Sequence, residues 1–306
     1  MDGFAGRLAV VTGGGSGMGR ELVRQLAAQG CSVAACDWNA AAVAGTAAMA
    51  QPGAPNGVRV SSHACDVSDE AQVQRFRDEL MREHAADHVD LVFSNAGIGG
   101  GASFLESSRE EWERTFAVNW WGTYYCARTF LPLLIASGDG VLVNTSSVNG
   151  FWASLGPRMP NSAYATAKFA IKGFTEALIE DLRTNAPHVR VALVMPGHVG
   201  TDIIANTRRA HGTPEPVDLT AARIEAAFRD KGLTAAAAAA IILDELRSGT
   251  WRILVGKDAK AIDAAVRARP EAAYDYAKLA MTAAKTAAEA RATNWLDAIR
   301  SYLPRG

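Results

Sequence analysis

Residues 8–29, LAVVTGGGSGMGRELVRQLAAQ, have the pattern of a short apolar strand, a glycine-rich turn and a helix. Within the turn, Gly13, Gly17 and Gly19 have the spacing G-x-x-x-G-x-G. Glycines at such positions let the chain turn tightly, bring its backbone close to a pyrophosphate and pack the helix against the strand. The first N–H groups of the helix then point at the phosphates. We therefore predict a dinucleotide-binding loop here rather than a plain flexible turn.

Short apolar runs alternate with longer helical patterns along most of the 306 residues. Most of these runs are continuously apolar, as strands covered on both faces are. Strands that alternate with helices form right-handed βαβ units and a parallel sheet. The predicted fold class is α/β, a Rossmann-type doubly wound parallel sheet of about seven strands flanked by helices. The expected strands are 8–12, 32–37, 58–65, 89–94, 140–145, 189–195 and 252–255, and the expected helices are 18–29, 70–84, 109–136, 163–185 and 234–248.

About 50 residues rich in Ala, Lys and Arg follow the last predicted strand. Their composition favours helix, with Pro270 as a break. We predict a dinucleotide-binding domain over residues 1–256 and a C-terminal helical extension over residues 257–306, packed on the same domain or on a neighbouring subunit. The extension forms either a surface helix pair or an arm that covers the active site. Its partial apolar face consists of Tyr274, Tyr276, Leu279, Met281, Trp295, Leu296 and Ile299.

Composition and charge argue against several classes of partner. Apolar residues make up 49% of the chain, which is enough for a sizeable core. The formal net charge of −1 gives no reason to expect a nucleic acid or an anionic membrane as partner. The four cysteines lack metal-ligand spacing, no apolar run is long enough for a membrane span, and no signal segment is apparent. We therefore expect a cytoplasmic protein without a bound metal.

Tyr164 and Lys168 stand four residues apart in a predicted helix, where their side chains share one face. A positive charge beside a phenol stabilises the phenolate and lowers the phenol pKa from its usual value near 10. Such a phenol suits general acid–base work on an alcohol oxygen. Tyr274 and Lys278 have the same spacing, so spacing alone decides nothing. Only the first pair comes after a predicted strand that is directly followed by two serines, Ser146 and Ser147, and we interpret the second pair as a helix surface.

Asp37 ends the second predicted strand, 18 residues after Gly19. This separation is close to the ~20 residues expected for an acid that binds ribose. Its carboxylate can accept hydrogen bonds from both ribose hydroxyls and would repel a 2′-phosphate. Ser16 and Trp38 stand where an arginine would have bound that phosphate. We predict NAD rather than NADP as the cofactor.

These features together resemble the short-chain dehydrogenase/reductase family in its compact single-domain branch, over residues 7 to about 256. The matching motifs are T-G-x-x-x-G-x-G at 12–19, an N-N-A-G turn at 94–97 with serine first, N-x-S-S-x-x-G at 144–150, Y-x-x-x-K at 164–168 and P-G-x-V-x-T at 196–201. The resemblance implies the catalytic set Ser147, Tyr164, Lys168 and Asn119. With the loop and the acid above, it implies cofactor contacts from Gly13, Gly15, Ser16, Gly17, Met18, Gly19, Asp37, Trp38, Asp66, Val67, Asn95, Ala96, Gly97, Tyr164, Lys168, Pro196, Gly197, Val199 and Thr201.

The resemblance implies hydride transfer between a nicotinamide and a carbon that bears a hydroxyl or oxo group. In that scheme Tyr164 exchanges a proton with the substrate oxygen, and Ser147 donates a hydrogen bond to the same oxygen. Lys168 lowers the Tyr164 pKa and binds the nicotinamide ribose. Asn119 positions a water that links the lysine to solvent, and Asp66 accepts from the adenine amino group.

The stretch between Ser147 and Tyr164 is four residues longer than the usual spacing in the family. Since loops absorb extra length easily, we expect the excess within residues 151–161 to reshape the rim of the substrate pocket. Pocket side chains are expected from the loop after residue 97, from 148–160 and from 200–232, the last of which would close as a lid. The apolar pocket side chains expected from the second of these segments are Phe151, Trp152, Leu155 and Met159.

Three basic residues near the expected pocket have an ordinary interpretation. His198 occupies the variable position of the P-G-x-V-x-T motif, and we interpret it as a loop residue that faces solvent. Arg208 and Arg209 could bind a carboxylate or phosphate, but we interpret them as flexible surface arginines.

We therefore predict an NAD-dependent oxidoreductase that interconverts a secondary alcohol and a ketone, with a hydrophobic substrate of cyclic, terpenoid, steroid-like or aryl type. Two alternatives stay open, an NADP-dependent ketoreductase and a non-catalytic NAD(H)-sensing regulator on the same fold. The resemblance also implies a homo-oligomer, a tetramer or a dimer. Aromatic side chains of the predicted helix 109–136 would lie at the subunit contact, namely Trp120, Trp121, Tyr124 and Tyr125.

Overall fold

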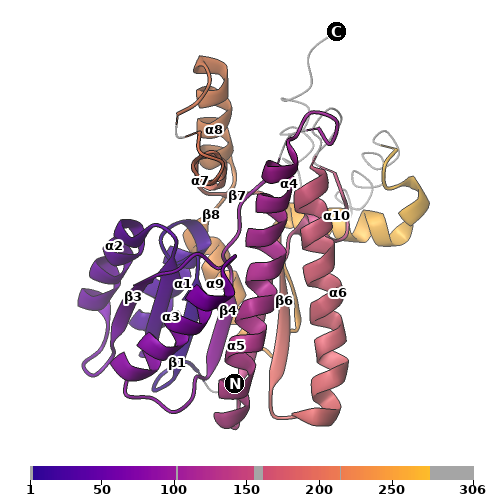
Figure 1. Cartoon of the computed structure of the whole chain (residues 1–306). Coiled ribbons are helices and arrows are strands. Elements are labelled where there is room, and N and C mark those ends of the chain that lie inside the picture. Colours follow the sequence, from indigo (N-terminus) through magenta and orange to yellow (C-terminus); the bar gives the residue numbers. More distant parts are fainter. Residues whose placement is uncertain (1–2, 101–102, 155–160, 214, 276–306) are drawn as a thin grey trace.

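Figure 1 shows the computed structural model of the chain, which describes residues 3–100, 103–154, 161–213 and 215–275. Seven strands form one parallel sheet in the order β3-β2-β1-β4-β5-β6-β9, which confirms the predicted doubly wound fold. These strands are β1 (Leu8–Thr12), β2 (Ser32–Asp37), β3 (Val60–Ala64), β4 (Leu91–Ser94), β5 (Val141–Thr145), β6 (Arg190–Pro196) and β9 (Arg252–Val255). A second, two-stranded parallel sheet contains β7 (Val199–Gly200) and β8 (Leu233–Thr234).

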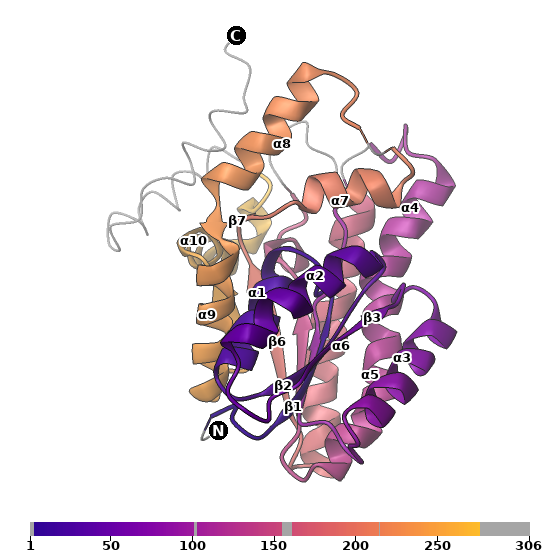
Figure 2. The same cartoon turned by 90° about the vertical axis from the view of Figure 1, so that its left-hand side faces the viewer.

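Helices cover both faces of the large sheet (Figures 1 and 2). Their bounds are α1 (Gly17–Ala28), α2 (Ala40–Ala50), α3 (Glu70–Glu83), α4 (Arg109–Phe116), α5 (Gly122–Ala136), α6 (Ser162–Asn185), α7 (Ile203–Ala210), α8 (Leu219–Lys231), α9 (Ala235–Arg247) and α10 (Lys257–Ala268). Short turns of 3₁₀ or π helix are η1 (Gln51–Gly53), η2 (Ala117–Trp121), η3 (Val148–Gly150) and η4 (Pro270–Ala272). In the described part of the chain, no helix is both long and apolar enough to cross a membrane.

All seven predicted strands are present, and their ends differ from the predicted ends by at most two residues. The predicted helix 109–136 is continuous but contains one π-helical turn, η2. Helix α2 was not predicted, because its alanine-rich sequence has no apolar periodicity. It forms instead through the helix propensity of alanine and through Asn39, whose side chain accepts a hydrogen bond from the Ala42 amide at 3.0 Å.

Each face of the sheet has its own hydrophobic layer. On one face, buried side chains of α1 and α9 such as Leu22, Leu26 and Ile242 pack on the strands. On the other face, α3, α5 and α6 supply side chains such as Phe76 and Phe130. The strands are thus apolar on both sides, which accounts for their continuous apolar runs in the sequence.

The carboxyl ends of the parallel strands meet at one edge, and α7 and α8 lie over that edge (Figures 1 and 2). Thr12 joins the ends of β1 and β4 there, because its Oγ1 accepts hydrogen bonds from the amides of Asn95 and Ala96 at 3.0 Å each. The order of the sheet reverses between these two strands. Ligands of doubly wound folds bind in the crevice at such a point.

The described part of the extension begins with α10, which packs against β9 and η3. Val148 and Trp152 form a separate apolar cluster there with Ile262, Val266 and Ala273. The remaining extension residues that we expected on its apolar face lie outside the described residues, namely Tyr276, Leu279, Met281, Trp295, Leu296 and Ile299. Lys278 and residues 155–160 lie outside them as well.

Candidate active site

The loop between β1 and α1 has a shape that requires glycine at several positions. Gly13 has a φ of +68°, and a Cβ atom added there would lie 2.8 Å from the Cα atom of Ala96. A Cβ atom added to Gly19 would lie 2.0 Å from the carbonyl oxygen of Gly13. The loop is therefore folded tightly onto β4, and the first turn of α1 faces the space above it.

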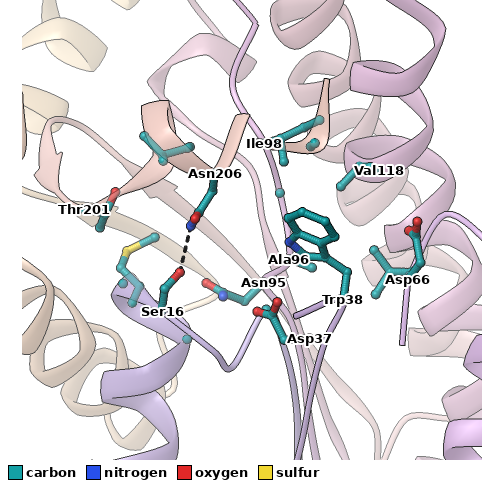
Figure 3. Close-up of a pocket in the computed structure, with 18 of the residues that line it drawn as sticks. Ser16, Asp37, Trp38, Asp66, Asn95, Ala96, Ile98, Val118, Thr201 and Asn206 are labelled. Atoms are coloured by element: carbon teal, nitrogen blue, oxygen red, sulfur yellow. Dashed lines mark hydrogen bonds between the residues drawn. The ribbon is translucent and has the colours of Figure 1, made fainter. Parts of the chain in front are cut away.

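A cleft opens above this loop, at the carboxyl ends of β1, β2 and β4 (Figure 3). Most of the predicted cofactor residues line it, together with several that were not predicted. The lining consists of Gly13, Ser16, Gly17, Met18, Gly19, Asp37, Trp38, Cys65, Asp66, Val67, Asn95, Ala96, Gly97, Ile98, Arg114, Val118, Thr201, Ile203, Asn206 and Ala210.

Six of the predicted cofactor residues are not part of this lining, namely Gly15, Tyr164, Lys168, Pro196, Gly197 and Val199. Gly15 lies beneath the cleft and donates its amide to Asp37. The turn at 196–199 joins β6 to β7 and contacts α10. A Cβ atom added to Gly197 would lie 2.2 Å from a carboxylate oxygen of Asp258.

Asp37 is fixed at the end of β2 by two backbone amides. Its Oδ2 accepts from Gly15 N at 3.0 Å, and its Oδ1 accepts from Asn39 N at 2.9 Å. Burial raises the pKa of this carboxyl, and the two hydrogen bonds oppose the rise. The indole of Trp38, the next residue, projects into the cleft beside it (Figure 3).

The carboxylate of Asp66, on the far side of the cleft, already has protein partners. Its Oδ2 accepts from Arg114 Nη2 at 2.8 Å, and its Oδ1 accepts from Ser68 Oγ at 2.7 Å. Burial would raise the pKa of Asp66, but the hydrogen bonds from Ser68 and Arg114 outweigh burial and lower it. Arg114 was missed in the sequence, because nothing in the charged run of α4 marks one arginine as facing the cleft.

Helix α7 covers the cleft and is bonded to the glycine loop. Asn206 Nδ2 donates a hydrogen bond to Ser16 Oγ at 3.0 Å (Figure 3). Ile203 and Ala210 of the same helix also line the cleft. The segment that we expected to act as a lid therefore lies in contact with the loop in this structure.

We interpreted His198 as a residue that faces solvent and Arg208 as a flexible surface arginine. Both interpretations were wrong. The His198 ring packs 4.3 Å from the Phe228 ring, and its Nε2 bonds the Phe228 carbonyl oxygen at 2.7 Å. Arg208 Nη2 lies 2.8 Å from Glu225 Oε2 in a largely buried ion pair. Both side chains hold α8 in place. No local sequence pattern predicts such contacts between separate elements.

Ser147, Tyr164 and Lys168 come together where β5 ends and α6 begins. Lys168 is only 3% exposed, and its Nζ donates to the Thr145 carbonyl oxygen at 3.0 Å. The same Nζ lies 5.3 Å from the centre of the Tyr164 ring. Ser147 Oγ accepts from the Asn149 amide at 3.2 Å, which fixes the hydroxyl at the strand end.

Burial has the largest effect on the pKa values of Tyr164 and Lys168. It raises the pKa of Tyr164, while the Ser147 hydroxyl beside the phenol lowers it. It also lowers the pKa of Lys168 to about 7, because a dry site disfavours the ammonium form. The sequence led us to expect a lowered Tyr164 pKa. In this structure of the protein chain, the Tyr164 pKa is raised instead, since the packing that places the lysine near the ring also removes water from the phenol.

Asn119 lies in the π-helical turn η2 and is fully buried. Its Nδ2 donates to the carbonyl oxygens of Ile98 and Thr115, each at 2.8 Å. Its Oδ1 has no hydrogen-bond partner among the described residues. A Cβ atom added to Gly97 would lie 2.8 Å from that oxygen and 3.4 Å from Lys168 Nζ. The backbone at Gly97 thus brings Asn119 and Lys168 close to each other, and π turns recur at functional sites.

A second cavity of about 260 Å³ lies between α4, α6 and α7. Its lining includes Gly99, Gly100, Trp112, Ile203 and Ile204. The same Ile203 also lines the cleft, so the two spaces are neighbours.

The expected contribution of residues 148–160 to this cavity is not observed for Phe151 and Trp152. Trp152 is 2% exposed and packs on α10, and Phe151 packs between the same cluster and Leu254. Leu155 and Met159 lie outside the described residues.

Asn161 was missed in the sequence. It is buried just before α6, and its Oδ1 lacks a hydrogen-bond partner in the described part of the chain. A Cβ atom added to Gly100 would lie 2.9 Å from that oxygen and 3.3 Å from Tyr164 Cβ. An unsatisfied acceptor thus lies close to Tyr164.

Comparisons with known proteins agree with this geometry. A family profile described as short chain dehydrogenase matches residues 7–212. The putative oxidoreductase SadH of Mycobacterium tuberculosis is 34% identical over 270 residues, which cover 87% of this chain and 92% of SadH. A short-chain dehydrogenase/reductase from Burkholderia phymatum, solved in complex with NAD, has a TM-score of 0.77 and 30% identity, and the match covers 89% of this chain and 95% of that chain. A metagenomic short-chain oxidoreductase in complex with NADP has a TM-score of 0.56 and 30% identity over 63% of this chain and 83% of that chain. The chain therefore belongs to the short-chain dehydrogenase/reductase family of oxidoreductases.

Proposed function

We propose that this protein is an NAD-dependent oxidoreductase that interconverts a secondary alcohol and a ketone. The observation that carries the proposal is the meeting of two sites at Gly97. This residue lines the dinucleotide cleft, and a Cβ atom added to it would lie 3.4 Å from Lys168 Nζ. A cofactor in the cleft and a substrate oxygen beside Tyr164 and Ser147 would therefore be neighbours, as hydride transfer requires.

The residues that line the cleft support the binding of a dinucleotide. A Cβ atom at Gly13 or Gly19 would clash with the backbone of Ala96 or Gly13, so the tight loop requires glycine at both positions. A loop of this glycine-rich kind lets a pyrophosphate come close to its backbone. Asn95 Oδ1 is buried beside this loop and has no partner among the described residues. Asp37 offers a fixed carboxylate for the adenosine ribose, and the Trp38 indole offers a flat surface for the adenine ring.

The nicotinamide cofactor, when bound, accepts or supplies the hydride. Tyr164 takes the hydroxyl proton during oxidation and returns it to the oxo oxygen during reduction. Ser147 donates a hydrogen bond to the same oxygen and holds it near the phenol. Lys168 places a positive charge near the phenol when it is protonated, and the Thr145 carbonyl orients it. Asn119 keeps the loop at Ile98 in position through its amide, which makes it a positioning residue.

The choice of NAD rests on the charges around the ribose site. Asp37 would repel a 2′-phosphate, and its position is fixed by Gly15 and Asn39. In the described lining the only arginine is Arg114, and its guanidinium is engaged by Asp66 and Ser68. The NAD complex of the Burkholderia relative supports the choice. The NADP complex of the metagenomic relative favours the alternative, an NADP-dependent ketoreductase.

We place a hydrophobic substrate in the cavity between α4, α6 and α7. Gly99 and Gly100 leave room beside the Tyr164 backbone, and Ile203 and Ile204 supply apolar surface. The volume of about 260 Å³ suits a compact cyclic or aryl alcohol. The lining also contains polar side chains such as Glu111 and His211, which could bind a polar group of that substrate. Ser147 and Tyr164 are not in the described lining, so the substrate oxygen would have to reach past Gly100 to meet them.

The test is turnover of a panel of cyclic, terpenoid, steroid-like and aryl alcohols and ketones, followed by the absorbance of the reduced cofactor. We expect activity with NAD(H), with a kcat/KM at least tenfold higher than with NADP(H). A preference for NADPH would establish the ketoreductase alternative. Binding of NADH without turnover of any panel member would instead favour the sensing regulator.

We also propose that the protein is a homo-oligomer. Trp120, Trp121, Tyr124 and Tyr125 form a connected set of aromatic rings on η2 and α5. Trp121 is 41% exposed, as is Phe169 of α6. Exposed aromatic surface of this kind marks contacts between proteins. Light scattering should therefore give the mass of a tetramer or a dimer, and a monomer mass at micromolar concentration would contradict the proposal.

A further inference from the structure

We propose that the first part of the C-terminal extension positions the segment that follows the catalytic serine. The Tyr274 hydroxyl and the Ala273 carbonyl hold residues 149–154, and through them they set how well the substrate binds beside Ser147. The inference rests on the proposed function for its kinetic test, but not for its structural one. We call the contact between Trp152–Ala153 and Ala273–Tyr274 the clasp.

Two hydrogen bonds make the clasp, between residues 121 positions apart. Trp152 Nε1 donates to the Ala273 carbonyl oxygen at 2.8 Å. The Ala153 amide donates to the Tyr274 hydroxyl at 3.1 Å. One bond comes from a side chain of the loop and the other from its backbone, so together they fix both the position and the orientation of this stretch.

The clasp packs against an apolar cluster. Trp152 is buried against Ile262 and Val266 of α10, and Val148 of η3 joins the same cluster. A tryptophan buries roughly 150–250 Å² when it packs in this way. The apolar contact brings the extension and the loop together, and the two hydrogen bonds set the register between them.

Asn149 connects the clasp to the catalytic serine. Its Nδ2 donates to the carbonyl oxygens of Trp152 and Ser154, at 2.9 and 2.8 Å, while its amide donates to Ser147 Oγ at 3.2 Å. Asn149 is buried, so these bonds do not exchange freely with water. A displacement of Trp152 or Ala153 would therefore move the group that orients the Ser147 hydroxyl.

The clasp also joins two features that depart from the usual family pattern. Residues 151–161 contain the four-residue excess before Tyr164, and the extension follows the last strand. A longer loop has more conformations to lose when it becomes ordered. The clasp holds Trp152 and Ala153 at the start of this stretch, and through these two residues the extension would influence substrate binding.

The experiment compares the wild-type protein with Tyr274→Phe, which removes only the hydroxyl. Hydrogen–deuterium exchange should become faster in the peptide that covers residues 148–154. With the best substrate of the panel, KM should rise about three- to tenfold, the range that loss of one hydrogen bond gives. We expect kcat within twofold of wild type and an unchanged Kd for NADH, because no residue of the clasp is in the described lining of the cofactor cleft.

Two further variants complete the test. Trp152→Phe removes the other hydrogen bond and should reproduce both effects. Tyr124→Phe removes a hydroxyl from the aromatic cluster of α5 and serves as the matched control, without either effect. Unchanged exchange in Tyr274→Phe would refute the clasp. Faster exchange with an unchanged KM, or equal losses in kcat and NADH affinity, would refute its positioning role. Absence of turnover in the wild type would refute the proposed function instead, and the exchange experiment would still decide on the clasp.

Discussion

Tyr164 at the start of α6 and Tyr274 in the turn after α10 are each followed in the sequence by a lysine four residues later, yet the surroundings of the two tyrosines are opposite. Tyr164 lies near Lys168 in a dry site beside Ser147. Tyr274 is 55% exposed, and its hydroxyl accepts a hydrogen bond from a loop amide. The difference teaches that the spacing by itself carries no chemistry. The first tyrosine has a proposed catalytic role because a buried strand end brings a serine next to it.

The largest expected effect comes from removing the Tyr164 hydroxyl. Tyr164→Phe should lower kcat by about 10³-fold or more, because the proton donor and acceptor for the substrate oxygen is lost. The Kd for NADH, measured by fluorescence, should stay within twofold of wild type. Tyr274→Phe is the matched variant and should leave kcat within twofold. If the two variants lost kcat equally, the comparison between the regions would fail.

The next effect concerns the lysine of the first pair. Lys168→Met should lower kcat by about 10²-fold, since the phenol loses its neighbouring charge. The same variant should be more stable, because burial already disfavours the ammonium of Lys168 and lowers its pKa to about 7. We expect its Tm at pH 7 to rise by about 2 °C or more. A Tm below that of wild type would show that the Thr145 contact outweighs the burial of the charge.

The difference in stability between Lys168→Met and the wild type should become smaller as the pH rises. An unfolded lysine loses its proton near pH 10.5 and the folded Lys168 near pH 7, so between these values the unfolded state binds more protons. The wild type therefore gains stability as the pH rises from 7, by at most about 1.4 kcal/mol per pH unit. The Tm advantage of Lys168→Met should shrink between pH 7 and pH 9. A constant difference in thermal scans would contradict the lowered pKa.

The smallest effect belongs to the lysine of the second pair. Lys278→Met should change kcat, KM and Tm by less than the error of the measurements, since the sequence before this lysine lacks the predicted strand and the serines that precede Lys168. Steady-state kinetics and a thermal scan at pH 7 and pH 9 would check this. A loss of activity comparable to that of Lys168→Met would mean that the second pair has a chemical role as well.

The sequence predicted the parts of the fold that depend on local patterns. Continuous apolar runs indicated the seven strands, since strands covered on both faces need apolar side chains at every position. The spacing of Gly13, Gly17 and Gly19 marked the loop of the cleft, because backbone conformation and close approach exclude other residues there. Asp37 could be predicted as well, because it ends the second strand at a typical distance from the glycine-rich loop.

Other parts of the site depend on contacts between distant segments and could not be predicted. Arg114 looks like any charged residue of an amphipathic helix, yet it pairs with Asp66 across 48 positions. His198 was interpreted as exposed, and its partner Phe228 lies on a helix that the sequence did not indicate. Trp152 was expected in the pocket, but α10 covers it, and no local pattern reveals which apolar side chain another segment will bury.

By itself, the sequence determined the seven strands, the helices with a clear apolar periodicity, the glycine-rich loop and the family, because these rest on residue types at short spacings. Only the tertiary structure decided which tyrosine stands in a dry site and which one holds a loop. It also decided the directions of the Tyr164 and Lys168 pKa shifts and the contact between the extension and the segment after Ser147. The physical reason is that burial and the alignment of hydrogen bonds depend on contacts between separate segments, 23 positions apart for Lys168 and Thr145 and 121 for Trp152 and Ala273, which only the folded chain brings together.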